Sequence, residues 1–257
     1  MLELNEFYVN GAWRRTQSTA KHPLVEAWSE RSFGSVALAS RDDVDFAVAS
    51  ARAAFPAWAA TTPADRIAIV QRIQDLYLKR AEDMAQAISR EMGAPIDLAR
   101  GAQVPLGARQ IANFLAAVEN FEFIREVGPH APTSRIVMEP IGVAALITPW
   151  NWPISQIALK VIAGLLAGCT LVLKPSEYAP LSANLFASIL HDAGVPPGVF
   201  NLVHGDGVGA GTWLSSHPDV AMVSFTGSTR AGVAVSIAAA ATLKRVALEL
   251  GGKGANL

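Results

Sequence analysis

The spacing of apolar positions divides the chain near residue 141 into two parts of different character. In the first part, apolar residues recur at helical spacing in three stretches, which predicts amphipathic helices over about 44–55, 63–92 and 105–121. Thr62, Pro63 and Asp65 have the residue types of an N-cap, a first helical position and a capping box. They predict where the second helix begins.

Two segments of the first part predict extended chain instead. The Asn10-Gly11 pair lies between apolar positions, which is typical of a β-hairpin over residues 7–13. Residues 122–140 contain Gly128, two prolines and an alternating stretch of apolar and polar residues. We expect them to form an extended arm or ribbon outside the compact core.

From residue 142 onward, short apolar runs alternate with helical patterns. Strands separated by single helices require crossover connections, so the fold class is α/β with a mostly parallel, open, Rossmann-like sheet and helices on both faces. In such a sheet, ligands bind beyond the carboxyl ends of the strands. The predicted strands are Val143–Thr148, Thr170–Lys174, Val199–His204, Ala221–Phe225 and Arg245–Leu250, and the predicted helices are about 154–167, 180–193, 208–216 and 229–241.

Composition and charge narrow the class of protein. The 257 residues are 51% hydrophobic, and 21 basic residues nearly balance 22 acidic ones, so no basic surface suggests nucleic acid. The single cysteine, Cys169, excludes an intramolecular disulfide, and the first residues carry no secretory pattern, which favours a cytoplasmic protein. The apolar segment from Ile141 to Leu173 is interrupted by Pro149 and Pro153, so we expect strand, turn and helix rather than a membrane span.

Polar side chains follow the first, second and fifth predicted strands. Asn151, in a turn bracketed by prolines, offers amide donors to an oxyanion, or else it caps the following helix. Lys174 and Glu177 are placed to hold the hydroxyls of a ribose, the alternative being an exposed charged loop. Glu249, beside two glycines, has the residue type of a general base, or else it is an ordinary surface residue.

The third and fourth predicted strands are followed by glycine-rich turns. Gly205–Gly211 formally satisfies the G-x-G-x-x-G/A pattern, but it follows the third strand and lacks an acid about 20 residues later. Thr226–Thr229 opens a helix with amides and hydroxyls suited to a phosphate, although Ser228 would equally serve as an ordinary cap. Together, the five strand ends favour a ligand site more strongly than any single motif does.

These segments resemble the successive signatures of the aldehyde dehydrogenase superfamily. The resemblance covers essentially all 257 residues. It implies an oxidoreductase that oxidises an aldehyde to a carboxylic acid with NAD(P), through a thiohemiacetal and a thioester. The matching segments, in the order of the family, are Tyr8–Gly11, Glu139–Val143, Pro149–Pro153, Lys174–Glu177, Phe225–Thr229 and Glu249–Lys253.

The resemblance also implies a role for each matching residue. Asn151 would donate to the oxyanion, Lys160 would lie near the nicotinamide ribose, and Glu249 would activate water. Glu177 favours NAD over NADP because a carboxylate repels a 2′-phosphate, although NADP stays possible. The residues that would bind the cofactor are Ile147, Thr148, Pro149, Trp150, Lys174, Ser176, Glu177, Gly207, Gly211, Phe225, Gly227, Ser228 and Leu250.

The resemblance further implies a division of the chain. Residues 1–121 and 141–257 would form a discontinuous NAD(P)-binding domain, and the arm at 122–140 would pair with another subunit of a dimer or tetramer. The nucleophilic cysteine of the family follows the Glu249–Lys253 motif, so we expect a fragment that lacks the catalytic domain and is inactive alone. The alternative is a non-catalytic nucleotide-binding remnant or module.

Cys169 and the histidines are expected to take no part in the chemistry. Cys169 precedes the second predicted strand and is interpreted as a buried core thiol. The histidines lack the spacing of metal ligands, so we expect no metal site and interpret each as a surface or loop residue. They are His22, His130, His191, His204 and His217.

Overall fold

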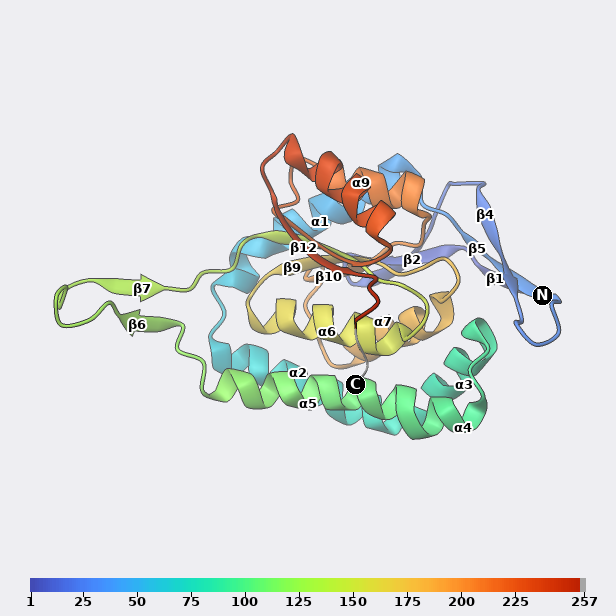
Figure 1. Ribbon diagram of the computed structural model, residues 1–257, viewed down its shortest axis with the longest axis horizontal. Coiled ribbons are helices and arrows are strands. Elements are labelled where there is room, and N and C mark those ends of the chain that lie inside the picture. The colour runs from blue at the N-terminus through green and yellow to red at the C-terminus, as the bar shows by residue number, and fades with distance from the viewer. Residues whose placement is uncertain (255–257) are drawn as a thin grey trace.

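The computed structural model describes residues 1–254, and its centre is a seven-stranded sheet in the order β12-β11-β8-β9-β10-β2-β3 (Figure 1). The five strands from the second part of the chain are parallel, which confirms the predicted fold class. They are β8 (Val143–Ile147), β9 (Thr170–Lys174), β10 (Phe200–Leu202), β11 (Met222–Gly227) and β12 (Arg245–Leu250).

The predicted amino-terminal hairpin is present and closes one edge of this sheet. Its strands are β2 (Glu6–Val9) and β3 (Ala12–Arg15), and β2 pairs antiparallel with β10. Asn10 and Gly11 have φ values of 53° and 76°, the left-handed geometry that a two-residue hairpin turn requires. The Asn10 amide also donates to Asn201 Oδ1 at 3.0 Å, which fixes the turn against β10.

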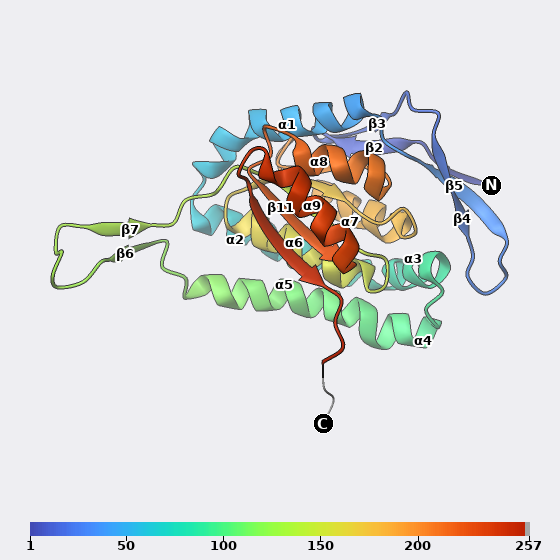
Figure 2. The ribbon, with the colours of Figure 1, turned by 45° about the horizontal axis from the view of Figure 1, so that its top comes forward.

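Helices cover both faces of the sheet. One face carries α1, α8 and α9, and Figure 2 shows α9 lying along β11 and β12. The other face carries α6 and α7, over which α2, α3 and α5 form an outer layer. The helices are α1 (Arg41–Ala59), α2 (Pro63–Lys79), α3 (Ala81–Met92), α4 (Ile96–Leu98), α5 (Val104–Glu119), α6 (Pro153–Leu166), α7 (Pro180–Asp192), α8 (Thr212–Ser216) and α9 (Thr229–Ala240), with π-helical turns η1 (Ala99–Gln103) and η2 (Gly207–Gly211).

The central strand β8 shows why its sequence is an uninterrupted apolar run. Ala145 and Ile147 belong to the core on the α1 side of the sheet, whereas Ala144 and Leu146 belong to the core on the α6 side. All five residues of the strand are buried. Because both faces are covered, alternation of apolar and polar residues is not needed, as is usual for parallel sheets.

The apolar segment between residues 141 and 173 folds as β8, α6 and most of β9, as expected from its prolines. Helix α6 has 14 residues and begins at Pro153. Over residues 1–254, no helix is both long enough and apolar enough to cross a membrane.

The predicted helix over 63–92 is wrong as a single element. Arg80, with φ −104° and ψ 19°, ends α2 and precedes α3, so the helix is interrupted there. The Arg80 amide still bonds to Leu76 and Tyr77 carbonyls, and apolar residues on both sides of the break enter the same core. The apolar spacing therefore continues across the break and gives no sign of it. The start of α2 is as predicted, with a capping box between Thr62 and Asp65.

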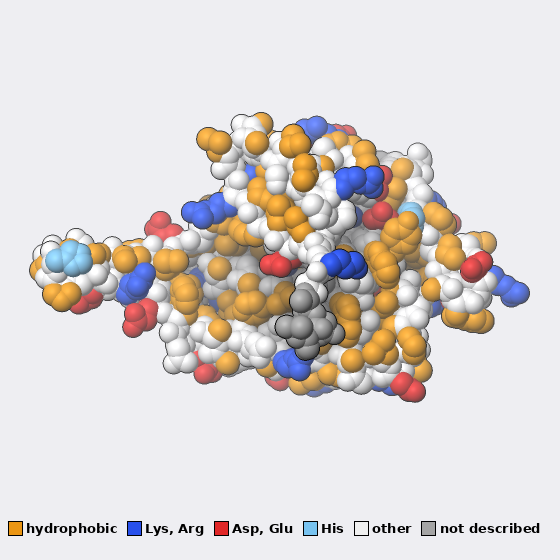
Figure 3. All heavy atoms as spheres, in the orientation of Figure 1, with side chains coloured by type: hydrophobic (Ala, Val, Ile, Leu, Met, Phe, Trp, Pro, Cys, Tyr) orange, Lys and Arg blue, Asp and Glu red, His pale blue; other side chains and the backbone are white. Residues whose placement is uncertain are grey.

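Residues 122–140 form a two-stranded antiparallel ribbon that projects from the body of the molecule (Figures 1 and 3). Its strands are β6 (Ile124–Glu126) and β7 (Arg135–Val137). Ile124, Val137 and Met138 are 64%, 53% and 48% exposed, so the ribbon presents apolar side chains to solvent. A two-stranded ribbon of this size is at best marginally stable alone.

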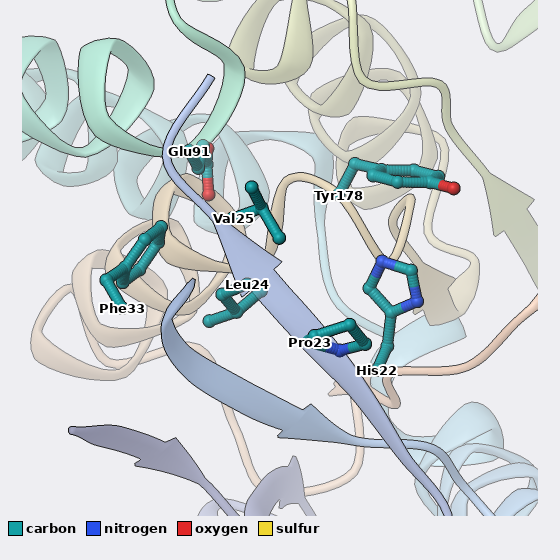
Figure 4. Close-up of a pocket in the computed structure, with 7 residues that line it drawn as sticks. All are labelled: His22, Pro23, Leu24, Val25, Phe33, Glu91 and Tyr178. Atoms are coloured by element: carbon teal, nitrogen blue, oxygen red, sulfur yellow. The ribbon is translucent and has the colours of Figure 1, made fainter. Parts of the chain in front are cut away.

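A small sheet that the sequence analysis did not predict packs beside α3. It joins β1 (Leu2–Leu4), β5 (Ser32–Ala37) and β4 (Lys21–Val25), whose short, partly exposed strands lack clear alternation. Between β4, α3 and the loop that precedes α7 lies a cavity of about 150 Å³, whose lining includes His22, Glu91 and Tyr178 (Figure 4).

Glu91, on α3, is the buried acid of this region. Its carboxylate accepts the backbone amides of Leu181 at 2.5 Å and Ser182 at 3.2 Å, and it also accepts the Ser182 hydroxyl. These groups lie in the first turn of α7, so Glu91 satisfies donors that the helix itself leaves free. Burial outweighs these hydrogen bonds and raises the pKa of Glu91 to about 8. Glu91 therefore ties α3 to the start of α7, shortly after the end of β9.

We expect Glu91→Ala to lower the free energy of unfolding by about 1–3 kcal/mol, because it leaves buried donors of α7 without an acceptor. Glu91→Gln keeps an acceptor oxygen and should cost less. The folded pKa of about 8 lies above the ordinary 4.5, so the contribution of Glu91 is complete below pH 4.5 and is lost as pH rises toward 8. Urea denaturation between pH 5 and 8.5 tests this. A Glu91→Gln variant with the same pH dependence as the parent would contradict it.

Candidate functional site

The register of the sheet brings four strand ends to one edge. Ile147, at the end of β8, lies opposite Lys174 of β9 and Phe225 of β11. Glu249 of β12 lies opposite Thr226 of β11. The side chains predicted from separate motifs therefore follow one row across the carboxyl edge of the sheet.

Lys174 and Glu177 form a buried to half-buried pair at this edge. Lys174 Nζ lies 3.4 Å from Glu177 Oε2 and donates to the Gly205 carbonyl at 2.6 Å, with its side chain 4% exposed and that of Glu177 21% exposed. Burial lowers the pKa of Lys174, and Glu177 opposes the shift. The structure thus excludes the alternative interpretation, in which Lys174 and Glu177 belong to an exposed charged loop. The ammonium group joins the end of β9 to the glycine-rich turn, and Glu177 stays within reach of solvent.

The glycine-rich turn carries its own negative charge at its start. Asp206 Oδ1 accepts the Gly209 amide at 2.6 Å and caps η2. A phosphate at this position would meet the Asp206 carboxylate at close range, which is unfavourable. Gly207 is exposed with open space around it, and Gly211 is buried. The turn therefore suits an uncharged part of a ligand better than a phosphate.

The start of α9 has no such charge. Ser228 Oγ accepts the Ala231 amide at 3.3 Å as an ordinary cap, and the first turn contains no acidic residue. The helix dipole and free amides there favour an anion. A Cβ atom at Gly227 would lie 2.5 Å from the Phe225 ring, so only glycine lets this ring fold against the backbone. Of the two glycine-rich turns, this one fits a phosphate.

Asn151 lies in the turn between β8 and α6. Trp152 occupies the N-cap position of α6 without a side-chain cap, so Asn151 does not cap this helix. Its carboxamide is exposed and makes no hydrogen bond within residues 1–254, whereas its carbonyl accepts Gln103 Nε2 at 3.4 Å. Trp150, in the same turn, is 49% exposed. The sequence analysis did not single out Gln103, which looks like any polar residue of a helical pattern.

Lys160 and Glu249 line a cavity of about 490 Å³ between α6 and the strands β11 and β12. Lys160 Nζ donates to Ser224 Oγ at 2.8 Å. Burial lowers the pKa of Lys160 to about 8, and the Glu249 carboxylate opposes the shift. The Thr226 hydroxyl, also on this cavity, is buried without a hydrogen-bond partner in the described part of the chain. Asn151 lies outside the lining of this cavity.

Cys169 is a buried thiol, as the sequence analysis expected, and is 6% exposed. It precedes Thr170, the first residue of β9, whereas the candidate site lies beyond the last. The length of a five-residue strand, about 16 Å, thus separates Cys169 from Lys174. The Cys169 thiol nevertheless lines the same cavity as Lys160 and Glu249. Burial raises the pKa of Cys169, the opposite of what an activated nucleophile needs.

His204 and His217 lie outside helices and strands, so the loop interpretation holds for them, but they are 0% and 8% exposed and are not surface residues. His204 Nε2 lies 2.7 Å from Asn184 Oδ1 of α7, and the His204 carbonyl accepts the Ala39 amide at 2.8 Å. Burial, with a smaller effect of Lys174, lowers the pKa of His204 to about 3. The sequence signal that could have indicated the burial of His204 is its place at the end of the apolar run predicted as a strand, Val199–His204. Within residues 1–254, no group of three or more acidic, histidine or cysteine side chains is arranged to hold a metal.

We expect His204 to make stability depend on pH below neutrality. Its folded pKa of about 3 lies below the ordinary 6.5, so the neutral imidazole stabilises the fold fully above pH 6.5 and progressively less as pH falls toward 3. The difference in unfolding free energy between the parent and His204→Asn should change by up to about 1.4 kcal/mol per pH unit in this window. Chemical denaturation from pH 7.5 to 4.5 measures it. A difference that is constant with pH would show that His204 titrates normally.

Comparison with known proteins agrees with this geometry. The profile of the aldehyde dehydrogenase family matches residues 13–257. A 3-succinoylsemialdehyde-pyridine dehydrogenase from a Pseudomonas species is 47% identical over 100% of this chain and 53% of its own length. The crystal structure of an aldehyde dehydrogenase from Bartonella henselae superimposes with a TM-score of 0.98 at 50% identity, over 100% of this chain and 54% of that one.

A second solved structure was determined with ligands. Aldehyde dehydrogenase C from Pseudomonas syringae, as a C291A mutant in complex with NAD+ and octanal, gives a TM-score of 0.95 at 50% identity, over 98% of this chain and 51% of that one. The chain thus spans about half the length of these relatives. With the family profile matched over nearly all of its residues, the chain belongs to the aldehyde dehydrogenase family.

Proposed function

We propose that this chain supplies the NAD-binding site and part of the catalytic machinery for the oxidation of an aldehyde to a carboxylic acid. The observation that carries the proposal is the strand register, which brings the Lys174–Glu177 pair and Glu249 to the same edge of the sheet. The Lys174–Glu177 pair suits the hydroxyls of a ribose, and the Glu249 carboxylate suits a general base.

The residues at this edge fit NAD. Lys174 and Glu177 would hold the hydroxyls of the adenosine ribose, and the acid-free start of α9 with Ser228 would hold the pyrophosphate. The Asp206 carboxylate would keep phosphate away from the glycine-rich turn, which leaves Gly207 open for the adenosine side. The remaining contacts would come from Ile147, Thr148, Pro149, Trp150, Ser176, Gly211, Phe225, Gly227 and Leu250.

Glu177 makes NAD the preferred cofactor over NADP. A 2′-phosphate beside this carboxylate would be repelled, and the neighbouring Lys174 ammonium group is already bonded to Gly205 and Glu177. The Pseudomonas syringae relative, which was crystallised with NAD+, agrees with this preference.

Three side chains of this chain would take part in the chemistry. NAD supplies the hydride acceptor when it is bound. The free Asn151 carboxamide would donate to the oxygen of the aldehyde as negative charge develops there, an interaction typically worth about 3–4 kcal/mol. Glu249 would take a proton from water, and Lys160 would provide a positive charge beside the cofactor.

Cys169 lines the cavity of Lys160 and Glu249 but is poorly suited to be the nucleophile of such a reaction. Cys169, the single cysteine of the sequence, is buried at the opposite end of β9 with a raised pKa. We infer that the attacking thiol belongs to the part of the relatives' length that this chain does not match. The same observation keeps a second function open, namely a nucleotide-binding module without catalysis of its own.

The assembly and location follow from the same proposal. Residues 1–121 and 141–257 would act as one NAD-binding domain, and the ribbon at 122–140 would pair with another subunit of a dimer or tetramer. The exposed Ile124, Val137 and Met138 support this, because such a ribbon gains stability only when it is covered. A protein with one buried, unpaired cysteine suits the cytoplasm.

We expect the 257-residue chain to bind NAD and Glu177→Gln to weaken that binding about tenfold to a hundredfold, since a charge-assisted hydrogen bond to the ribose is lost. The same substitution should narrow the preference for NAD over NADP. Isothermal titration calorimetry measures both, with Glu119→Gln, an exposed glutamate at the end of α5, as the matched control. No binding of NAD at millimolar concentration by the parent chain would refute the proposed site.

We also expect no aldehyde-dependent formation of NADH by this chain alone, because its single thiol is buried and burial raises the pKa of that thiol. Absorbance at 340 nm with octanal as substrate tests this. Turnover that disappears in Cys169→Ser would overturn our placement of the nucleophile. Both candidate functions predict that the isolated chain binds NAD without turnover. They are distinguished by joining this chain to the remaining half of a full-length relative. Aldehyde oxidation by the joined protein would favour the catalytic function.

A further inference from the structure

Lys160 has a hydroxyl as its hydrogen-bond partner in a cavity that also contains a carboxylate. Lys160 projects from α6 toward the sheet, and its ammonium group donates to Ser224 Oγ of β11 at 2.8 Å. Glu249, on the next strand, lines the same cavity. Within residues 1–254, no ion pair of 4.0 Å or less joins Lys160 to Glu249.

The electrostatic environment favours such an ion pair. The lining of the cavity, contributed by α6, β8, β9, β11 and β12, contains two charged side chains, Lys160 and Glu249. The third titratable group there is the Cys169 thiol, whose raised pKa keeps it neutral. A half-buried ammonium group gains from the nearest carboxylate, and a lysine side chain is flexible enough to move toward it.

We propose that Ser224 is a positioning residue that holds the Lys160 ammonium group away from Glu249 and so keeps the Glu249 carboxylate unpaired. The hydroxyl accepts the hydrogen bond that the carboxylate would otherwise accept. The consequence for catalysis rests on the proposed function, in which Glu249 takes a proton from water.

An unpaired carboxylate matters because a direct ion pair would weaken the base. An opposite charge at close range lowers the pKa of a carboxylate by about 1–3, and its oxygens become occupied by the partner. A general base works best with a pKa near the working pH and with a free oxygen in reach of the proton it removes. Ser224 therefore separates two groups that the proposed chemistry needs side by side but not in contact.

The test is a titration of Lys160 itself, in the 257-residue chain labelled with ¹³C at the lysine Cε atoms. The Lys160 signal is assigned by its absence in Lys160→Arg. The parent chain should give a pKa of about 8. In Ser224→Ala the ammonium group is free to approach Glu249, so its pKa should rise by about 1 or more. In Ser224→Ala combined with Glu249→Gln, the rise should disappear.

Two further variants define the role of the hydroxyl. Ser224→Thr retains the hydroxyl, so the pKa of Lys160 should equal that of the parent. Ser188→Ala removes a remote serine hydroxyl of α7 and should also leave the pKa of Lys160 unchanged. An unchanged or lowered pKa in Ser224→Ala would overturn the proposal, as would a rise that persists without the Glu249 carboxylate. The titration contains neither NAD nor aldehyde, so a failure of the chain to bind NAD would refute the proposed function and leave this result standing.

Discussion

Parallel hydrogen bonding between β8 and its neighbours β9 and β11 sets the position of every candidate functional residue. Helices cover both faces of these strands, so a polar side chain finds room chiefly where a strand ends. Because the strands run in one direction and in register, those ends meet at one edge. Motifs that are far apart in the sequence become neighbours for this reason.

Two lysines of this edge show different solutions to the burial of a cation. Lys174 is almost fully buried and satisfies its ammonium group with a carbonyl and a carboxylate, Gly205 and Glu177. Lys160 is half-buried and relies on the Ser224 hydroxyl, with Glu249 nearby but unpaired. Burial lowers the pKa of both side chains. The first arrangement suits a fixed structural link, and the second suits a group whose charge can respond to a ligand.

The sequence allowed the main sheet to be predicted, since apolar runs and Asn10-Gly11 are local signals, and its strand-end motifs led to the candidate site residues. It did not reveal the break at Arg80, where the apolar spacing continues from α2 into α3. The structural roles of His204 and Ser224 were not predicted from the sequence for another reason. Their importance depends on partners that are 20 and 64 residues away, and no local pattern encodes such contacts. The roles assigned by resemblance, such as that of Asn151, remain predictions.

The amino-terminal hairpin has a consequence for the order of folding. Strands β9 to β12 each pair with a parallel strand that precedes them in the chain, so each can pair soon after it is made. The hairpin is synthesised well before β10, yet its turn bonds to Asn201 of that strand, 191 residues later. At roughly 5–20 residues per second, translation leaves β2 without its second neighbour, β10, for about 10–40 s. During that interval one edge of β2 has no neighbouring strand, so its backbone groups are open to pairing with other chains.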